Sequence, residues 1–182
     1  MTHVMIDIET KGTRTDTTVL AIGAVKFDIH SNTGMAQELY LHPDLEQQRL
    51  MQRTEDPATM QWWDTQSEAV RYEAFRMDCR IPLESALDQL SEFCADAGTV
   101  WAQGPQFDIS ILESLYTSLG KRKPWRFNQI RDSRTLFGIL GDRRDKNATG
   151  LHNALEDARS QARAAQQAMA YLEEITTAWT EI

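Results

Sequence analysis

The stretch HVMIDIET, residues 3–10, has the apolar residues of a core strand, yet it carries two carboxylates. Because side chains alternate between the two faces of a strand, Asp7 and Glu9 project from the same side. Burying two like charges together is costly unless a cation neutralises them or that face of the strand is solvated. The stretch alone therefore leaves two interpretations open, a metal site and a wet strand end.

The composition is that of an ordinary globular domain. The chain has 182 residues, of which 41% are hydrophobic and 25% are charged, and this length suits a single core, so we expect one domain over residues 1–182. No apolar run approaches the roughly 20 residues that cross a bilayer, and the N-terminus lacks the pattern of a secretory signal. We therefore expect a cytoplasmic protein without membrane contact.

Charge is distributed unevenly along the chain. The net charge is −8, which argues against a protein that wraps long duplex through bulk electrostatics. Residues 121–146 nevertheless contain nine basic residues and three acids, a net charge of +6, so the rest of the chain carries −14. This basic stretch is a candidate for contact with nucleic acid or with a partner subunit, and a solvated surface is the alternative.

The pattern of apolar residues predicts an α/β fold. Three strands are expected near the start of the chain, and the short turn-prone segments between them favour an antiparallel meander. The expected strands are 3–9, 18–28, 35–42 and 99–103. The expected helices are 44–52, 57–64, 66–77, 81–97, 107–120, 132–140 and a long helix that runs from 156 to the end, with a polar loop at 141–150. This order describes a mixed sheet with helices on its faces.

Two further acids fall where ligands gather in such folds. Asp108 follows the strand at 99–103 and opens a helix, and Asp157 lies near the start of the last long helix. Taken singly, each has a simpler explanation, because an acid in the first turn of a helix is stabilised by the helix dipole. Four converging carboxylates would instead suit hard divalent cations such as Mg²⁺ and Mn²⁺.

His152 precedes Asp157 by five residues. On one regular helix the two side chains would point about 140° apart, so a shared site requires His152 to lie in the loop or at the very start of the helix. With an ordinary pKa near 6.5, a histidine there can accept a proton from water at neutral pH. A histidine that only caps or packs against the helix is the alternative.

Three motifs together resemble a known family. The segments DIET, GPQFD and HNALED, which contain Asp7, Glu9, Asp108, His152 and Asp157, follow one another as do the three motifs of the DEDD 3′-5′ exonuclease (DnaQ-like, RNase T-like) superfamily. Histidine five residues before the last aspartate is typical of its DEDDh subclass. The segments MQWWDTQSEA and FNQIRDSRTL further resemble a branch with phage exonuclease A proteins and small bacterial 3′-5′ exoribonucleases. The second motif departs from the family, which often has asparagine where this chain has QGP.

The resemblance implies an RNase H-like fold and a reaction. Asp7, Glu9, Asp108 and Asp157 would hold two Mg²⁺ or Mn²⁺ ions, and His152 would act as the general base. The enzyme would remove nucleoside 5′-monophosphates from the 3′ end of single-stranded nucleic acid. A homodimer is plausible on the same ground. A catalytically inactive nucleic-acid- or protein-binding module on this fold is the rival hypothesis, and the sequence leaves RNA against DNA open.

Substrate-binding residues are harder to assign than the acids. Single strands are commonly held by basic side chains and by aromatic rings that stack on bases. The adjacent Trp62 and Trp63 lie in an expected helix, where one of them should pack in the core. The candidates for substrate contact are Thr10, Trp63, Phe107, Arg131 and Arg134, and core packing or a solvated surface is the alternative for the aromatic and basic ones.

Overall fold

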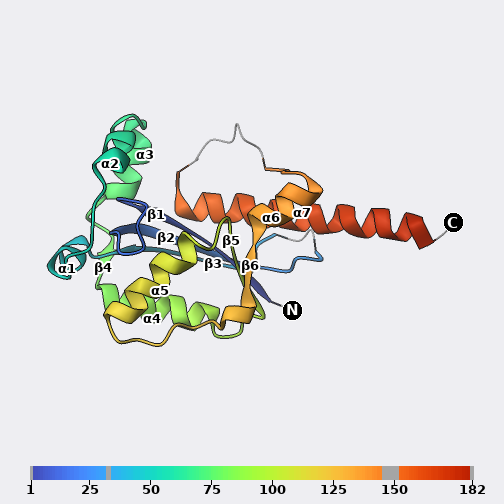
Figure 1. Cartoon of the computed structure of the whole chain (residues 1–182), viewed down its shortest axis with the longest axis horizontal. Coiled ribbons are helices and arrows are strands. Elements are labelled where there is room, and N and C mark those ends of the chain that lie inside the picture. The colour runs from blue at the N-terminus through green and yellow to red at the C-terminus, as the bar shows by residue number, and fades with distance from the viewer. Residues whose placement is uncertain (1, 32–33, 145–151, 181–182) are drawn as a thin grey trace.

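The computed structural model describes residues 2–31, 34–144 and 152–180, and a mixed sheet runs through its middle (Figure 1). The order across the sheet is β4-β3-β2-β1-β5-β6. The strands are β1 (His3–Thr10), β2 (Val19–Phe27), β3 (Gln37–Pro43), β4 (Arg80–Ile81), β5 (Thr99–Ala102) and β6 (Ile130–Asp132). β1, β2 and β3 pair antiparallel, whereas β5 pairs parallel with β1 and β6 with β5. The expected mixed sheet is thus confirmed.

Two strands of the sheet escape the sequence pattern. β4 has two residues and β6 has three, and alternation with period two cannot be recognised over so short a run. β6 is defined by its neighbour instead, because it pairs residue by residue with β5. Asp132, which the pattern assigns to the start of a helix, therefore ends β6 and caps the following helix through its side chain.

Helices cover both faces of the sheet (Figure 1). α6 and α7 lie on one face, α4 and α5 lie on the other, and α2 and α3 stand together near the end of β1. Their bounds are α1 (Leu45–Leu50), α2 (Pro57–Asp64), α3 (Glu68–Phe75), α4 (Leu83–Cys94), α5 (Asp108–Ser118), η1 (Phe127–Gln129), α6 (Ser133–Leu140) and α7 (Ala154–Thr180). The expected helices are all present. α2 has the expected bounds, and the other helices have shifted ends.

The alternation of β1 decides which way its acids point. Its even-numbered residues from Val4 to Ile8 pack with α4 and α5 in one hydrophobic cluster. Met5 packs on the opposite face, in a cluster with alanines of α7. Asp7 and Glu9 continue the row that Met5 begins, so both carboxylates lie on the α7 side of the sheet.

α7 is long and extends past the sheet (Figure 1). It begins two residues before the expected start at 156 and runs to Thr180, the last described residue, as expected of a helix that runs to the end. Within the described parts of the chain, no helix has both the length and the apolar character that crossing a bilayer requires. The expected polar loop at 141–150 lies outside the described residues from position 145 onward.

Candidate active site

The start of α7 reaches the acidic part of β1 because β2 carries a glycine there. Gly23 pairs with Asp7 across the antiparallel ladder. A Cβ atom on Gly23 would lie 2.2 Å from the carbonyl group of Ala154, the first residue of α7. No side chain fits in that space, so glycine allows the helix to begin directly against the sheet. Asp157, in the first turn of α7, is thereby held close to Asp7.

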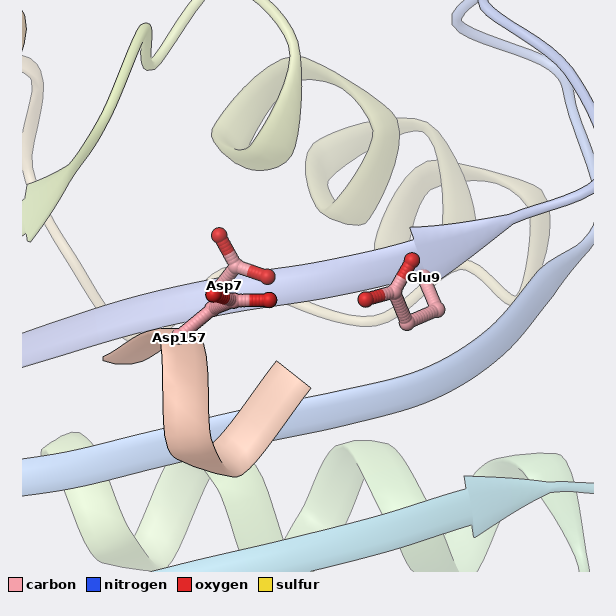
Figure 2. Close-up of side chains that lie close together, drawn as sticks. All are labelled: Asp7, Glu9 and Asp157. Atoms are coloured by element: carbon pink, nitrogen blue, oxygen red, sulfur yellow. The ribbon is translucent and has the colours of Figure 1, made fainter. Parts of the chain in front are cut away.

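Three of the four predicted metal ligands form one cluster. One carboxylate oxygen from each of Asp7, Glu9 and Asp157 lies within 4.8 Å of the others. Figure 2 shows Asp7 and Glu9 projecting from the same side of β1, while Asp157 approaches Asp7 from α7. Residues that are about 150 positions apart in the chain thus present their oxygen atoms to one small volume.

Asp108, the fourth predicted ligand, lies next to this cluster and is not part of the set of oxygens within 4.8 Å. It is the first residue of α5 and is 4% exposed. Its Oδ1 accepts a hydrogen bond from the backbone N–H of Ile8 over 3.2 Å. Asp108 therefore ties α5 to the strand that carries Asp7 and Glu9.

The environment of these acids disfavours their charged forms. Burial raises the pKa of Glu9 to about 8, and the charges of Asp157 and Asp108 contribute. Burial raises the pKa of Asp7 well above its ordinary value, and the neighbouring acids raise it further. Burial also raises the pKa of Asp108 to about 7 and the pKa of Asp157 above its ordinary value. Desolvation and mutual repulsion thus act together on the cluster.

The chemistry of this donor set suits a hard divalent cation. Carboxylate oxygens are the ligands that Mg²⁺ and Mn²⁺ prefer, and a nearby cation would favour the charged forms that burial disfavours. Among the described residues, no lysine or arginine forms a salt bridge with any of the four acids. The cluster is therefore an acidic site able to hold a metal ion.

His152 lies just ahead of α7, the position that a site shared with Asp157 requires. Its φ of 65° is in the left-handed region, which is uncommon for a residue with a side chain. In this conformation its backbone N–H donates to Asp157 Oδ2 over 2.9 Å. Its ring lies edge-on to Trp62, with 4.7 Å between the ring centroids. The histidine is thus tied to the acid cluster and to α2.

A groove of about 470 Å³ opens beside Glu9. Three predicted substrate-binding residues, Thr10, Trp63 and Phe107, line it together with Trp62. Trp63 is 1% exposed, and its Nε1–H donates to the carbonyl of Thr10 over 2.8 Å, so it forms the wall mainly by packing. Trp62 is 39% exposed and offers the larger aromatic surface. Contact of these residues with a substrate stays a prediction.

The two predicted arginines lie in different places. Arg134, in the first turn of α6, donates from Nη2 to the carbonyl of Gln103 over 3.1 Å, and its positive charge opposes the rise in the pKa of Asp108. Arg131 lies on β6, the edge strand, and its guanidinium contacts two carbonyl groups of its own segment. The fold thus brings Arg134 near the acids and leaves Arg131 outside the groove.

Sequence reasoning missed Gln161. Its Nε2 donates to Asp7 Oδ1 over 2.7 Å, although 154 positions separate the two residues. Gln161 follows Asp157 by four residues in α7 and therefore lies on the same face of the helix. That spacing is the signal that would have identified it.

Comparisons with known proteins agree with this arrangement. A family model described as the 3′-5′ exoribonuclease Rv2179c-like domain matches residues 2–169. A comparison with curated proteins finds no match. Among solved structures, a zinc-bound complex of E. coli exonuclease I with single-stranded DNA is similar, with a TM-score of 0.65 and 12% sequence identity. A complex of the same enzyme with a dA16 oligonucleotide has a TM-score of 0.62 and 10% identity.

These alignments cover most of this chain and less than half of the other protein. They include 95% of this chain and 43% of the exonuclease I chain in the zinc-bound complex, and 96% and 42% in the dA16 complex. At such low identity the likeness concerns the fold, which is the RNase H-like fold expected from the sequence. The family match spans nearly the whole chain. The chain therefore belongs to the 3′-5′ exoribonuclease Rv2179c-like domain family.

Proposed function

We propose that the chain hydrolyses single-stranded nucleic acid from the 3′ end, in a metal-dependent reaction that releases nucleoside 5′-monophosphates. The observation that supports the metal dependence is the approach of Asp7, Glu9 and Asp157 to within 4.8 Å of one another. Three acids with raised pKa values in so small a volume are destabilising unless a cation accompanies them. We propose that they hold two Mg²⁺ or Mn²⁺ ions together with Asp108.

Each side chain has a separate role in this proposal. When bound, the two ions supply the positive charge that activates water and stabilises the scissile phosphate and the leaving 3′-oxygen. His152 accepts the proton of the attacking water at a ring nitrogen, and Trp62 holds the ring from the side. This assignment places the chain in the DEDDh subclass. The hydrogen bond that the backbone N–H of Ile8 donates to Asp108 keeps α5 at the site.

The substrate is proposed to enter as a single strand. The groove beside Glu9 contains aromatic and hydroxyl side chains that suit a terminal nucleotide, among them Thr10, Trp63 and Phe107. The exonuclease I structures are complexes with single-stranded DNA or oligonucleotides, whereas the family is described as exoribonuclease. We favour RNA on the second ground and treat DNA as an alternative substrate of the same site.

A labelling experiment tests the proposal. Single-stranded RNA and DNA of the same sequence, each labelled at the 5′ end, are incubated with the protein and Mn²⁺. We expect stepwise shortening from the 3′ end, its loss in chelator, and faster shortening of RNA. Asp7→Asn should abolish the reaction while the variant remains folded by circular dichroism. Absence of shortening by the wild-type chain, or normal turnover by Asp7→Asn, would contradict the proposal.

The setting of the enzyme is a further part of the proposal. We propose that residues 1–182 act as one exonuclease domain, in the cytoplasm, and that two copies form a homodimer. Sedimentation of the purified chain decides the last point, because a monomer at micromolar concentration would refute the homodimer.

A further inference from the structure

In the part of the chain that the structure describes, four of the exposed arginines that form no salt bridge with a carboxylate lie close together in the sequence. Six other arginines, Arg14, Arg49, Arg71, Arg76, Arg144 and Arg159, each form a salt bridge with an acid. In the described residues, Arg122, Arg126, Arg131 and Arg134, here called the arginine edge, form none. The chain has 27 acidic and 19 basic side chains, so unpaired arginines are not a consequence of a shortage of acids.

The arginine edge leads away from the catalytic acids. Arg134 contacts the carbonyl of Gln103, in the segment between β5 and Asp108. Arg131 follows on β6, which forms one border of the sheet. Arg126 and Arg122 precede β6, beyond η1. Figure 1 shows β6 leading directly up into α6, with the chain that precedes β6 below it.

The far end of the arginine edge opens into a groove of about 950 Å³. Arg122, Lys123, Arg126 and Phe127 line it, and the ring of Phe127 is 84% exposed. The segment is anchored by Trp125, which is 3% exposed and donates from Nε1 to Glu113 over 2.9 Å. An anchored loop thus presents two unpaired guanidinium groups and one free aromatic ring to solvent.

We propose that the arginine edge and this groove bind the 5′ part of a single-stranded polynucleotide whose 3′ end lies at the acid cluster. The inference rests on the proposed function and adds a second contact region to it. Arginine pairs with phosphate through its planar fork, and exposed aromatic rings stack on unpaired bases. The residues outside 121–146 carry a net charge of −14. Their electrostatic potential repels a polyanion from the rest of the surface and favours binding along the arginine edge.

A single strand fits this surface better than a duplex or a protein does. The arginine edge follows one edge strand, so it offers a single row of cations with an aromatic ring at its end. One phosphate backbone complements the row of cations, and its unpaired bases complement the ring. An acidic partner protein would be drawn to the arginines, but it would leave Phe127 without a base to stack on. A second copy of the chain in the groove is the other occupant that the test separates.

The experiment compares long and short substrates. The edge variant is Arg122→Gln with Arg126→Gln, a separate variant is Phe127→Ala, and the matched control is Arg14→Gln with Arg49→Gln, which removes the same charge elsewhere. The substrates are a dinucleotide and a single strand of roughly 20 nucleotides, longer than the roughly 4–16 nucleotides that single binding folds cover. Affinity for the long strand is measured in chelator, and kcat/KM is measured with Mn²⁺ at several salt concentrations.

We expect the edge variant to hydrolyse the dinucleotide as the control does and to bind the long strand at least about tenfold more weakly. Each lost phosphate contact should lower the slope of log affinity against log salt by about 0.7, hence by about 1.4 for the pair. Phe127→Ala should weaken long-strand binding at least about fivefold, the loss of one stacked base. These changes, absent from the control, would support the inference.

Other results overturn the inference without involving the proposed function. Equal long-strand affinity of the edge variant and the control would refute it. A changed oligomeric state of the edge variant, with equal losses of long-strand affinity and of dinucleotide hydrolysis, would also refute it. The groove would then be a contact between copies of the chain. If the wild-type chain shortens neither substrate, the proposed function fails, and long-strand affinity in chelator still decides whether the arginine edge binds nucleic acid.

Discussion

Gln161 donates a hydrogen bond from Nε2 to Asp7 Oδ1 over 2.7 Å, so α7 holds one acid of the cluster while contributing another. Gln161 is 3% exposed, and its Oε1 has no hydrogen-bond partner among the described residues. A buried amide oxygen left unsatisfied costs about 1–3 kcal/mol. We propose that the contact with Asp7 fixes the orientation of this carboxylate at the proposed metal site.

Gln161→Leu tests that role. Removal of the donor leaves Asp7 free to rotate, and loss of a partner of this kind costs about 10–100-fold in metal affinity or activity. We therefore expect Mn²⁺ binding, measured by calorimetry, to weaken by that factor. Thermal stability in chelator should change little, because leucine also removes the unsatisfied oxygen.

Gln166→Leu is the matched control. Gln166 is another buried glutamine of α7, and its Nε2 donates to the carbonyl of Asp28, away from the acids. This variant should bind Mn²⁺ as the wild type does even if its melting temperature falls. Equal Mn²⁺ affinity of the two glutamine variants would show that Gln161 does not position Asp7.

Stability of the metal-free protein should fall as pH rises from about 4 to 8. The pKa of Glu9 is raised from 4.5 to about 8 and that of Asp108 from 3.8 to about 7. At pH values between the pKa of each acid in the unfolded chain and its pKa in the folded protein, the folded state binds more protons. The free energy of unfolding therefore decreases with increasing pH. Each kcal/mol lost lowers the melting temperature of a chain of this size by about 2–4 °C. Calorimetric melting in chelator across this range checks the direction.

Asp7→Asn should reduce that pH dependence. The amide does not titrate, so the variant loses the contribution of Asp7, whose own pKa is raised by burial and by the charges of Asp108, Glu9 and Asp157. At pH 8 in chelator the variant should melt above the wild type, and added Mn²⁺ should reverse the order by stabilising the wild type alone. A wild-type protein whose melting temperature rises with pH in chelator would contradict the burial of charged acids.

His152→Ala should separate proton transfer from metal binding. A positioned general base contributes typically about 10²–10⁴-fold to the rate, so kcat should fall within that range. Mn²⁺ affinity should be retained, because the hydrogen bond from His152 to Asp157 is donated by the backbone N–H, and alanine keeps that group. The acidic limb of the pH–rate profile should also change. Wild-type kcat at neutral pH would exclude His152 as the base.

The acids were predictable from sequence because each depends on a local rule. Strand alternation places Asp7 and Glu9 on one face, and the irregular approach to α7 allows His152 to meet Asp157. The looser placement of Asp108 was not predictable, because it depends on a hydrogen bond that Asp108, in α5, accepts from the backbone N–H of Ile8 in β1. Likewise, helical spacing predicts that one of two adjacent tryptophans is buried, but only tertiary packing decides that it is Trp63.

β6 and the arginine edge show the same limit at a larger scale. The charge of residues 121–146 is visible in the sequence, yet the pairing of each cation is not. Salt bridges such as Lys123 with Glu113 join residues on different elements, so only the fold shows which arginines remain free. The three-residue strand β6, which is defined by its pairing with β5, places part of this basic stretch at the edge of the sheet.

Gly23→Ala tests whether the approach of α7 to β2 builds the site. A Cβ at this position would lie 2.2 Å from the Ala154 carbonyl, so α7 must move away from the sheet. Overpacking of this kind costs about 1–3 kcal/mol, and displacement of Asp157 should weaken Mn²⁺ binding as well.

Gly138→Ala is the control, because a Cβ there meets nothing within 4 Å and alanine favours a helix by about 1 kcal/mol over glycine. Gly23→Ala should therefore melt lower and bind Mn²⁺ more weakly, whereas Gly138→Ala should melt at or above the wild type. A Gly23→Ala protein with wild-type melting and Mn²⁺ affinity would mean that the cluster forms without the close contact of α7 and β2.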